Sequence, residues 1–493
     1  NMTEEKLYEN EDMDAYWENF EANASVFREA LPKVIRDFQG EAVKFSHYND
    51  IPAGICFFNI LGQIVKDFIY VPSGSNLEDT RIHFCWVQTS GTGKSTMWNF
   101  VGPVSKNVFK KINDKGKHPS LVLKGRQPMG RTFDIFGLTD YTDSVLIGKF
   151  KEKFDDEGEL SWERIAGQLE GNGLAHWDEF EYSGIFKQSQ HQEKSIVYMN
   201  TLMNSLAGES WIISKALTSY DNQIMECFSE RSVIAMTYPP SNLNNVMAEK
   251  GVLQRMLLFV WEVPKFIQHK MRLEQIRQAG KYVPVEQEIE KYSNALFTIY
   301  ELVEERFREV GGDPLKVMKY SPDFNDVLTL EYNNMNNYLW NTRPEVEAIA
   351  SNFTTRLMKI LMKMSVLCSV ASAPSIKNKN DRFLVTGHNV RQAATIVRQS
   401  YMTLVDWLER SLRVRQKSVA EKADESIFKK AFEVLDKNEE GFVHKGKLFE
   451  TVRKKSKKSQ SQIYRNYASI QHKFEETKIG QSKYVKYIAG DIE

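Results

Sequence analysis

The sequence predicts an α/β protein with helical segments on both sides of the α/β part, and three observations favour this class. A short apolar run, Ile82 to Val87, has the composition of a strand and leads into a Gly-rich turn. The chain from there to about Pro264 mixes short strand-like and helical patterns, as an α/β domain does. From Lys265 to about Lys417 the pattern is mostly helical, apart from a polar loop at 377–381.

Chain length and breaks in pattern predict four parts. A chain of 493 residues exceeds one compact core, so roughly two to four domains are expected. The charged stretch 415–424 has the character of a linker. We expect the following parts: an N-terminal helical domain at 2–75, an α/β core at 76–264, a helical lid at 265–417 and a small C-terminal domain at 424–493.

The N-terminal part is predicted to be helical. Apolar residues recur at helical spacing from Tyr16 to Leu31, and a second apolar helix is expected over Ile55 to Ile69. The run 72–75 then breaks the chain. Polar residues interrupt the apolar stretch Ile55 to Val71, so it is expected to be a core element and not a membrane span.

The C-terminal part has the pattern of a winged helix. Three short apolar faces at helical spacing occupy 427–435, 448–452 and 463–474, before a turn at Gly480 and a strand-like end.

Charge and cysteine content narrow the classes of function. Lys plus Arg equals Asp plus Glu, 65 each, so contact with nucleic acid must come from local patches or from the lining of a channel. Four widely separated cysteines, each among apolar neighbours, predict buried reduced thiols rather than a zinc site or a disulfide framework. We expect an intracellular protein, cytoplasmic or nucleoid-associated.

The segment from Gln88 to Ser95, QTSGTGKS, matches the phosphate-binding pattern GxxxxGK[ST] except at Gln88. Glycines let backbone N–H groups curl around phosphates, Lys94 meets the β and γ oxygens, and the Ser95 hydroxyl holds Mg²⁺. The expected ATP-binding residues are Ser90, Gly91, Thr92, Gly93, Lys94, Ser95 and Thr96.

Four further residues, in three segments, suit ATP hydrolysis. A strand-like run ends in Asp178 and Glu179, which would orient Mg²⁺ through water and polarise the attacking water. Another apolar run ends at Thr237, a polar position suited to sensing the γ-phosphate. Arg255 precedes an apolar strand, from which it could reach across a subunit boundary to stabilise transition-state charge.

These pieces resemble, in order and spacing, the AAA+ core of the minichromosome maintenance (MCM) helicase family. Beyond the motifs above, the family's short signatures are similar to FGLT at 136–139, DEFEYS at 178–183, WIISKA at 211–216, VLQRML at 252–257, TTRL at 354–357 and VTGHNVRQA at 385–393. The family's sensor asparagine falls at Thr237 or Tyr238. The zinc and OB-fold domain of the family has no counterpart here, which suggests a compact version from a virus, plasmid or other mobile element.

The resemblance implies a RecA-like ATPase core with a helical lid, using ATP and Mg²⁺, in a ring that is expected to be hexameric. Arg255 and Arg356 would act on the nucleotide of a neighbouring subunit. Lys215 would lie at the tip of a hairpin that projects into the ring channel and contacts single-stranded DNA. Residues 147–172 are expected to form a helical insert beside this hairpin. The implied activity is unwinding of forked DNA in genome replication, with a primase or another replisome protein as a possible partner and no membrane.

The C-terminal part carries a basic cluster that we interpret as a phosphate-binding face for DNA. Its residues are Lys445, Lys447, Arg453, Lys454, Lys455, Lys457 and Lys458. The same cluster also suits a solvated face or a protein-docking module. For the whole chain, two alternatives stay open: an AAA+ machine that is not a helicase, such as a transposition regulator or protein remodeller, and an ATP-binding DNA scaffold with a degenerate site, which Gln88 would permit.

Overall fold

The computed structural model of the chain forms two compact units that divide between Trp407 and Leu408. It describes residues 30–116, 132–138, 142–154, 156, 158–183, 185–186, 194–204, 207–208, 211–217, 223–249, 251–339 and 342–488. The predicted helix from Tyr16 to Leu31 lies almost wholly outside these residues. The part expected at 76–264, the described portion of 2–75 and residues 265–407 of the expected lid belong to the first unit, whereas residues 408–417 belong to the second.

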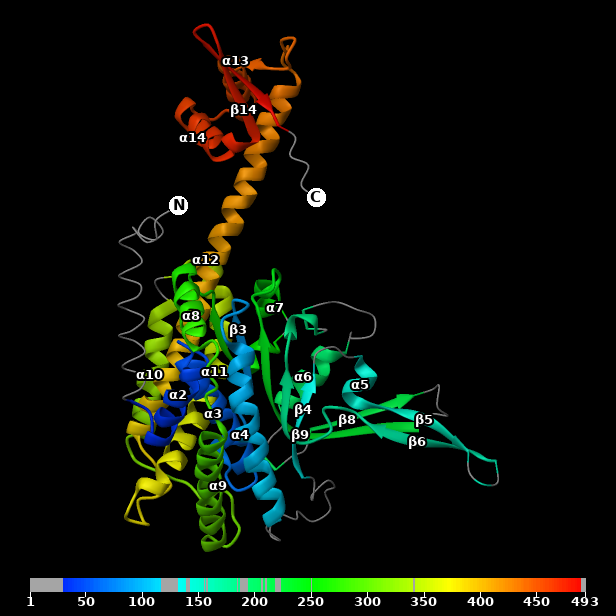
Figure 1. Cartoon of the computed structure of the whole chain (residues 1–493), viewed down its shortest axis with the longest axis vertical. Helices are drawn as coiled ribbons and strands as arrows, with labels where there is room; N and C mark the ends of the chain where they lie inside the picture. Colours follow the sequence, from blue (N-terminus) through cyan, green and yellow to red (C-terminus); the bar gives the residue numbers. More distant parts are fainter. Residues whose placement is uncertain are drawn as a thin grey trace. The chain divides into compact units, whose positions relative to one another are not determined.

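A mixed sheet with five parallel strands forms the centre of the first unit (Figure 1). Its strand order is β10-β3-β9-β7-β4, and β8 adds to β9 in the antiparallel direction. The first strand of this sheet along the chain, β3, therefore lies between its last two, β9 and β10. The bounds are β3 Phe84–Gln88, β4 Phe133–Leu138, β7 Gly171–Trp177, β8 Trp211–Leu217, β9 Gln223–Thr237 and β10 Leu257–Trp261.

The apolar runs of the sequence explain the inner strands. Every residue of β3 and β10 is buried, as expected of parallel strands covered on both faces. In the parallel register Val87 lies opposite Thr237 and Trp177 opposite Ala235. The carboxyl ends of β3, β9 and β7 therefore meet at one edge of the sheet.

Helix α3 (Asp50–Val65) packs directly on this sheet, with α2 (Lys33–Phe45) beside it. Fifteen of the sixteen residues of α3 are buried. The amide of Asn59 donates to the carbonyl oxygens of Ile82 (2.5 Å) and Val233 (3.1 Å). A Cβ on Gly62 would lie 2.2 Å from the Thr80 carbonyl oxygen, so the close approach of this helix requires glycine. The helical N-terminal segment is thus part of the α/β core.

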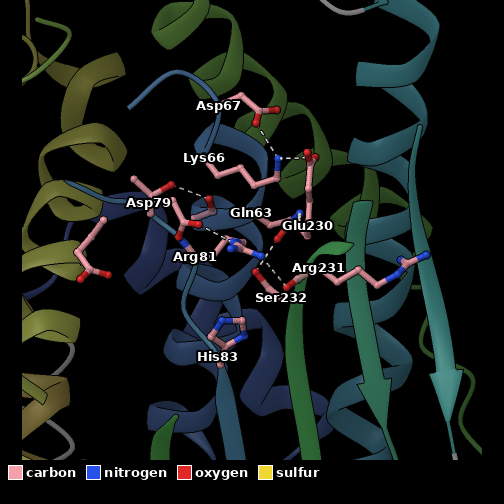
Figure 2. Close-up of polar contacts among 12 residues, drawn as sticks. Gln63, Lys66, Asp67, Asp79, Arg81, His83, Glu230, Arg231 and Ser232 are labelled. Carbon is pink, nitrogen blue, oxygen red and sulfur yellow. Dashed lines mark hydrogen bonds and ion pairs between the residues drawn. The ribbon is translucent and has the colours of Figure 1, made fainter. Parts of the chain in front are cut away.

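An ion pair between Lys66, the residue that follows α3, and Glu230 of β9 joins these two elements, as Figure 2 shows. The Lys66 ammonium lies 2.7 Å from Asp67 and 3.1 Å from Glu230. Burial alone would lower the pKa of Lys66, but the two carboxylates outweigh it and raise that pKa to about 12. The predicted break after α3 is a small hairpin, β1 (Val71–Ser73) and β2 (Asn76–Glu78).

The segment expected as a helical insert is a β-hairpin, so that prediction was wrong. Helix α5 (Asp143–Ile147) ends where β5 (Gly148–Phe154) begins, and β5 pairs with β6 (Leu160–Ala166). The physical reason is the period of the sequence: lysines at 149, 151 and 153 alternate with other residue types, which is the period of a strand. This hairpin and the β8–β9 hairpin extend to the same side of the sheet (Figure 1).

The remaining elements of the first unit are mostly helical. In chain order they are α4 (Lys94–Lys115), η3 (Phe180–Tyr182), α6 (Ser195–Met203), α7 (Leu243–Glu249), η5 (Leu253–Arg255), α8 (Lys265–Gln278), α9 (Glu286–Glu309), β11 (Lys319–Tyr320), α10 (Phe324–Leu339), α11 (Pro344–Ser372), η6 (Ala373–Ser375), β12 (Leu384–Val385) and the part of α12 (Gly387–Glu433) up to Trp407. The segment Pro344–Ser375 is long and apolar enough to cross a membrane. However, 67% of its most apolar stretch is buried within the unit, as in the core helix of a globular domain. All four cysteines are buried, and none of them forms a disulfide.

The second unit is a small helical domain with a three-stranded sheet of order β13-β15-β14. The C-terminal part of α12 forms its first helix, and the expected linker at 415–424 lies within that helix. Phe428, Tyr467 and Phe474 pack against one another in its core. The other bounds are β13 Val443–His444, α13 Lys445–Ser456, α14 Gln460–Ile470, η7 Gln471–Lys473, β14 Phe474–Ile479 and β15 Ser482–Tyr487.

Candidate functional site

The Gly-rich loop lies between the end of β3 and the start of α4. Gly91 (φ 71°) and Gly93 (φ 99°) adopt left-handed backbone conformations that favour glycine. Lys94 is the first residue of α4, a helix of 22 residues. The free N–H groups and partial positive charge of such a helix start suit an anion.

A cavity of about 480 Å³ opens beside this loop, at the carboxyl edge of the sheet. This volume is in the range of small-ligand sites. The loop, the end of β7, the end of β9 and α8 all contribute. The lining residues are Ser90, Gly91, Gly93, Lys94, Ser95, Thr96, Asp178, Glu179, Glu181, Tyr182, Met236, Thr237, Tyr238 and Gln275. Nine of the site residues predicted from the sequence thus line one cavity, whereas the loop residue Thr92 is buried and does not line it.

The Lys94 ammonium is held inside the loop by backbone oxygens. Its Nζ donates to the carbonyls of Gln88 (2.6 Å) and Thr89 (3.2 Å). Burial lowers the pKa of Lys94 to about 8, although the carboxylates of Glu181 and Asp178 act in the opposite direction. Because burial destabilises the charged form of Lys94, an anion that enters the cavity would stabilise this ammonium strongly.

Two acidic residues follow β7 directly. Asp178 accepts a hydrogen bond from the Glu179 backbone N–H at 3.1 Å. Glu179 has a φ of 51°, which is uncommon for a residue with a side chain and is found at functional sites. The Ser95 hydroxyl and the Asp178 carboxylate are oxygen donors, the ligand type that Mg²⁺ prefers.

Thr237 and Glu181 form a polar pair at the base of the cavity. The Thr237 hydroxyl donates to Glu181 Oε2 at 2.5 Å, and both side chains are almost fully buried. Because β9 lies between β3 and β7, Thr237 is positioned between the loop and the Asp178 end. The sequence reasoning missed Glu181, although an acidic residue three positions after Asp178 was a visible signal. Tyr238, the second possible sensor position, also lines the cavity.

Arg255 and Arg356 lie near each other, and neither lines the cavity of its own chain. Arg255 donates from Nε to Asn204 Oδ1 (2.8 Å) and from Nη1 to the Gly251 carbonyl (2.6 Å). Burial lowers the pKa of Arg255, and the charge of Arg356 lowers it further. In the described part of the chain neither guanidinium pairs with a carboxylate, so together they form a site of concentrated positive charge.

Lys215 lies within β8 and pairs in register with Met225. The expectation that it occupies the tip of the hairpin is therefore corrected, because two more residues of β8 follow it. The turn at 218–222 lies outside the described residues, as do the side chain of Lys215 and Thr139 of the FGLT signature.

The basic cluster of the second unit divides into two groups. Lys445 pairs with Glu476 and its Nζ lies 4.5 Å from the centre of the Tyr467 ring, while Lys458 lies 2.8 Å from Asp424. These two lysines therefore have carboxylate partners within the unit. The exposed members are Lys447, Arg453, Lys454, Lys455 and Lys457, of which Lys454 pairs with Glu450 and Lys455 donates to a backbone oxygen.

No protein-family model matches the chain, and no curated protein matches it at a significant level.

Proposed function

We propose that the chain is an AAA+ ATPase that assembles into a ring and acts as a DNA helicase in the replication of a small genome. One observation carries this proposal: the phosphate loop, the Asp178–Glu179 pair and Thr237 line a single cavity at the carboxyl edge of a parallel sheet. These are the parts that ATP hydrolysis needs, and each reaches the cavity from a different strand.

The mechanism follows from these residues. Lys94 and the N–H groups of the loop bind the β and γ phosphates of ATP, and Ser95 and Asp178 would hold Mg²⁺. When bound, Mg²⁺ would supply positive charge that offsets the negative charge of the phosphate oxygens. The exposed Glu179 carboxylate accepts a proton from the attacking water. Thr237, whose hydroxyl donates to Glu181, lines the same cavity.

Arg255 and Arg356 complete the site from a neighbouring copy. They lie outside the cavity of their own chain, close together and without a carboxylate partner among the described residues, which favours action in trans. Two guanidiniums on the γ-phosphate would stabilise the charge of the transition state. ATP then binds at the boundary of two subunits.

Strand β9 supports a link between ATP hydrolysis and DNA movement. Its first half pairs with β8 in the hairpin, and its last residue is Thr237 in the cavity. Arg231, midway along β9, is buried and donates to the Glu170 carbonyl at 2.9 Å beside β7. In this proposal, a displacement at the cavity end of β9 reaches the hairpin through this one strand. In this proposal Lys215 contacts single-stranded DNA, and the second unit is a winged helix whose Lys447, Arg453 and Lys457 bind DNA phosphates.

The test is strand displacement from a forked DNA, measured together with phosphate release. Lys94→Ala should lose both because it removes the phosphate cation, and Glu179→Gln should retain ATP binding but lose hydrolysis, a cost of about 3 kcal/mol or more in the transition state. Lys106→Ala, an exposed lysine on the same helix α4, is the matched control and should behave as wild type.

Each outcome separates the alternatives. DNA-stimulated phosphate release without strand displacement would indicate a remodeller or transposition regulator, and the helicase proposal would be abandoned. ATP binding without phosphate release would indicate a DNA scaffold. Equal turnover in Glu179→Gln and wild type would exclude Glu179 from the reaction.

A further inference from the structure

We propose that Gln88, Asn49 and Ser46 are positioning residues for the phosphate loop, and that the turn between α2 and α3 sets the loop's ability to bind a nucleoside triphosphate. The inference rests on the proposed ATPase function and deepens it. None of the three side chains lines the cavity. They contact the loop from behind.

Gln88 occupies the position where the phosphate-loop pattern has its first glycine. Its side chain is fully buried at the end of β3. Its Nε2 lies 2.9 Å from both Asn49 Oδ1 and Thr92 Oγ1, and its Oε1 accepts from Trp86 Nε1 at 2.6 Å. The amide thus joins the strand, the loop and the α2–α3 turn. A glycine could make none of these contacts.

Asn49 and Ser46 hold two successive carbonyl groups of the loop. Asn49 Nδ2 donates to the Thr92 carbonyl at 2.9 Å, and Ser46 Oγ donates to the Gly93 carbonyl at 2.8 Å. Asn49 Nδ2 also donates to Ser46 Oγ at 2.7 Å, so the two side chains support each other. Both residues are almost completely buried.

These contacts determine the direction of the loop's N–H groups. In a planar trans peptide the C=O and the following N–H point in opposite directions. Because Asn49 and Ser46 hold the carbonyls of Thr92 and Gly93 behind the loop, the N–H groups of Gly93 and Lys94 turn away from them. Phosphate binding by a loop depends on N–H groups that are already directed before the ligand arrives.

The packing leaves little freedom for another arrangement. A Cβ on Gly93 would lie 2.5 Å from Ser46 Oγ and 3.1 Å from Asn49 Nδ2. The turn and the loop are therefore in direct contact at Gly93. A sequence change that restores the common glycine at 88 would remove the hydrogen bonds that Gln88 makes with Asn49 Oδ1, Thr92 Oγ1 and the buried Trp86 Nε1. Gln88→Gly should consequently weaken nucleotide binding, although it improves the match to the pattern.

The experiment measures binding of Mg²⁺ and ATPγS to the full chain and compares Asn49→Ala with Asn59→Ala. Asn59 is the matched control because it is a buried asparagine on α3 that donates to backbone carbonyls of the sheet but not to the loop. Both variants should lower thermal stability. Only Asn49→Ala should weaken ATPγS binding, by roughly tenfold or more, because it removes the buried hydrogen bonds of Asn49 with the Thr92 carbonyl, Ser46 Oγ and Gln88 Nε2. Gln88→Gly should show a similar loss.

The outcomes are distinct from those of the proposed function. If wild type does not bind ATPγS, both the function and this inference fail. If wild type binds and Asn49→Ala and Gln88→Gly bind as tightly as Asn59→Ala, only the positioning role is overturned. Should Asn49→Ala fail to fold, Ser46→Ala tests the same contact at Gly93 with a smaller change, and undiminished affinity in Ser46→Ala and Gln88→Gly would overturn the proposal.

Discussion

The buried ammonium of Lys94 predicts a pH dependence of stability that a neutral side chain should abolish. Burial lowers its pKa from 10.5 to about 8. Below pH 8 the lysine is protonated in both the folded and the unfolded chain, and the fold bears the full penalty of burying the charge. As the pH rises from about 8 toward 10.5, the folded chain releases this proton before the unfolded chain does, so the penalty diminishes and stability rises.

The magnitude follows from the size of the shift. A lowering from 10.5 to about 8 corresponds to about 3 kcal/mol at neutral pH, at 1.36 kcal/mol for each pKa unit. Between pH 7 and 9.5 about 2 kcal/mol of this penalty should disappear from the wild type. Lys94→Met has no such penalty. The free energy of unfolding of the variant minus that of the wild type should therefore fall by about 2 kcal/mol across this range.

Urea unfolding of both proteins at a series of pH values measures this difference. Tryptophan fluorescence suits the assay, because all nine tryptophans lie at or before Trp407, in the first unit. Subtraction of the two curves removes the titration of groups that the proteins share. A difference that stays constant from pH 7 to 9.5 would refute the reasoning, since Lys94 would then not be a desolvated cation.

Three further predictions concern packing, catalysis and the second unit. Gly62→Ala should lower the free energy of unfolding by more than about 2 kcal/mol, because the new Cβ would clash with the Thr80 carbonyl. At Gly40 a Cβ would have no atom within 4 Å, so Gly40→Ala should be neutral or stabilising by up to about 1 kcal/mol. The same urea titration measures both variants. Glu181→Gln should lower the rate constant of ATP hydrolysis about tenfold or more with little change in KM, because Thr237 loses its carboxylate partner; a KM effect alone would contradict this. In the second unit, Lys458→Ala should lower stability and leave DNA affinity intact, because its ammonium pairs with Asp424. Arg453→Ala should weaken DNA binding and reduce the salt dependence of that binding by about one ion. The reverse pattern in a salt series would show that these two basic residues have been assigned the wrong roles.

Much of the candidate site could be predicted from the sequence because its residues stand at or just after the ends of apolar runs. Such runs form parallel strands buried on both faces, and the carboxyl ends of parallel strands meet at one edge. Lys94, Asp178 and Thr237 follow three of these runs and line one cavity. The α/β core and the helical segments around it followed from the same patterns.

Other features depend on contacts that a linear pattern does not contain. The partners of Gln88 are 39 residues away at Asn49 and four residues away at Thr92, so Gln88 could be read only as a departure from a motif. The N-terminal helices were separated from the core because the break after α3 was visible while the packing of α3 on β9 was not. Lys445 and Lys458 were grouped with the other basic residues because their carboxylate partners, Glu476 and Asp424, are distant in the sequence.

The central claim is that a complete ATP site is shared between two copies of the chain. Mixing Lys94→Ala subunits with Arg255→Ala subunits tests it most directly, because neither protein alone contains an interface with both an intact loop and an intact arginine. Under conditions in which subunits exchange, the mixture should release phosphate and displace DNA strands faster than either variant alone. A mixture no more active than its components, with exchange demonstrated by labelled subunits, would contradict the shared site.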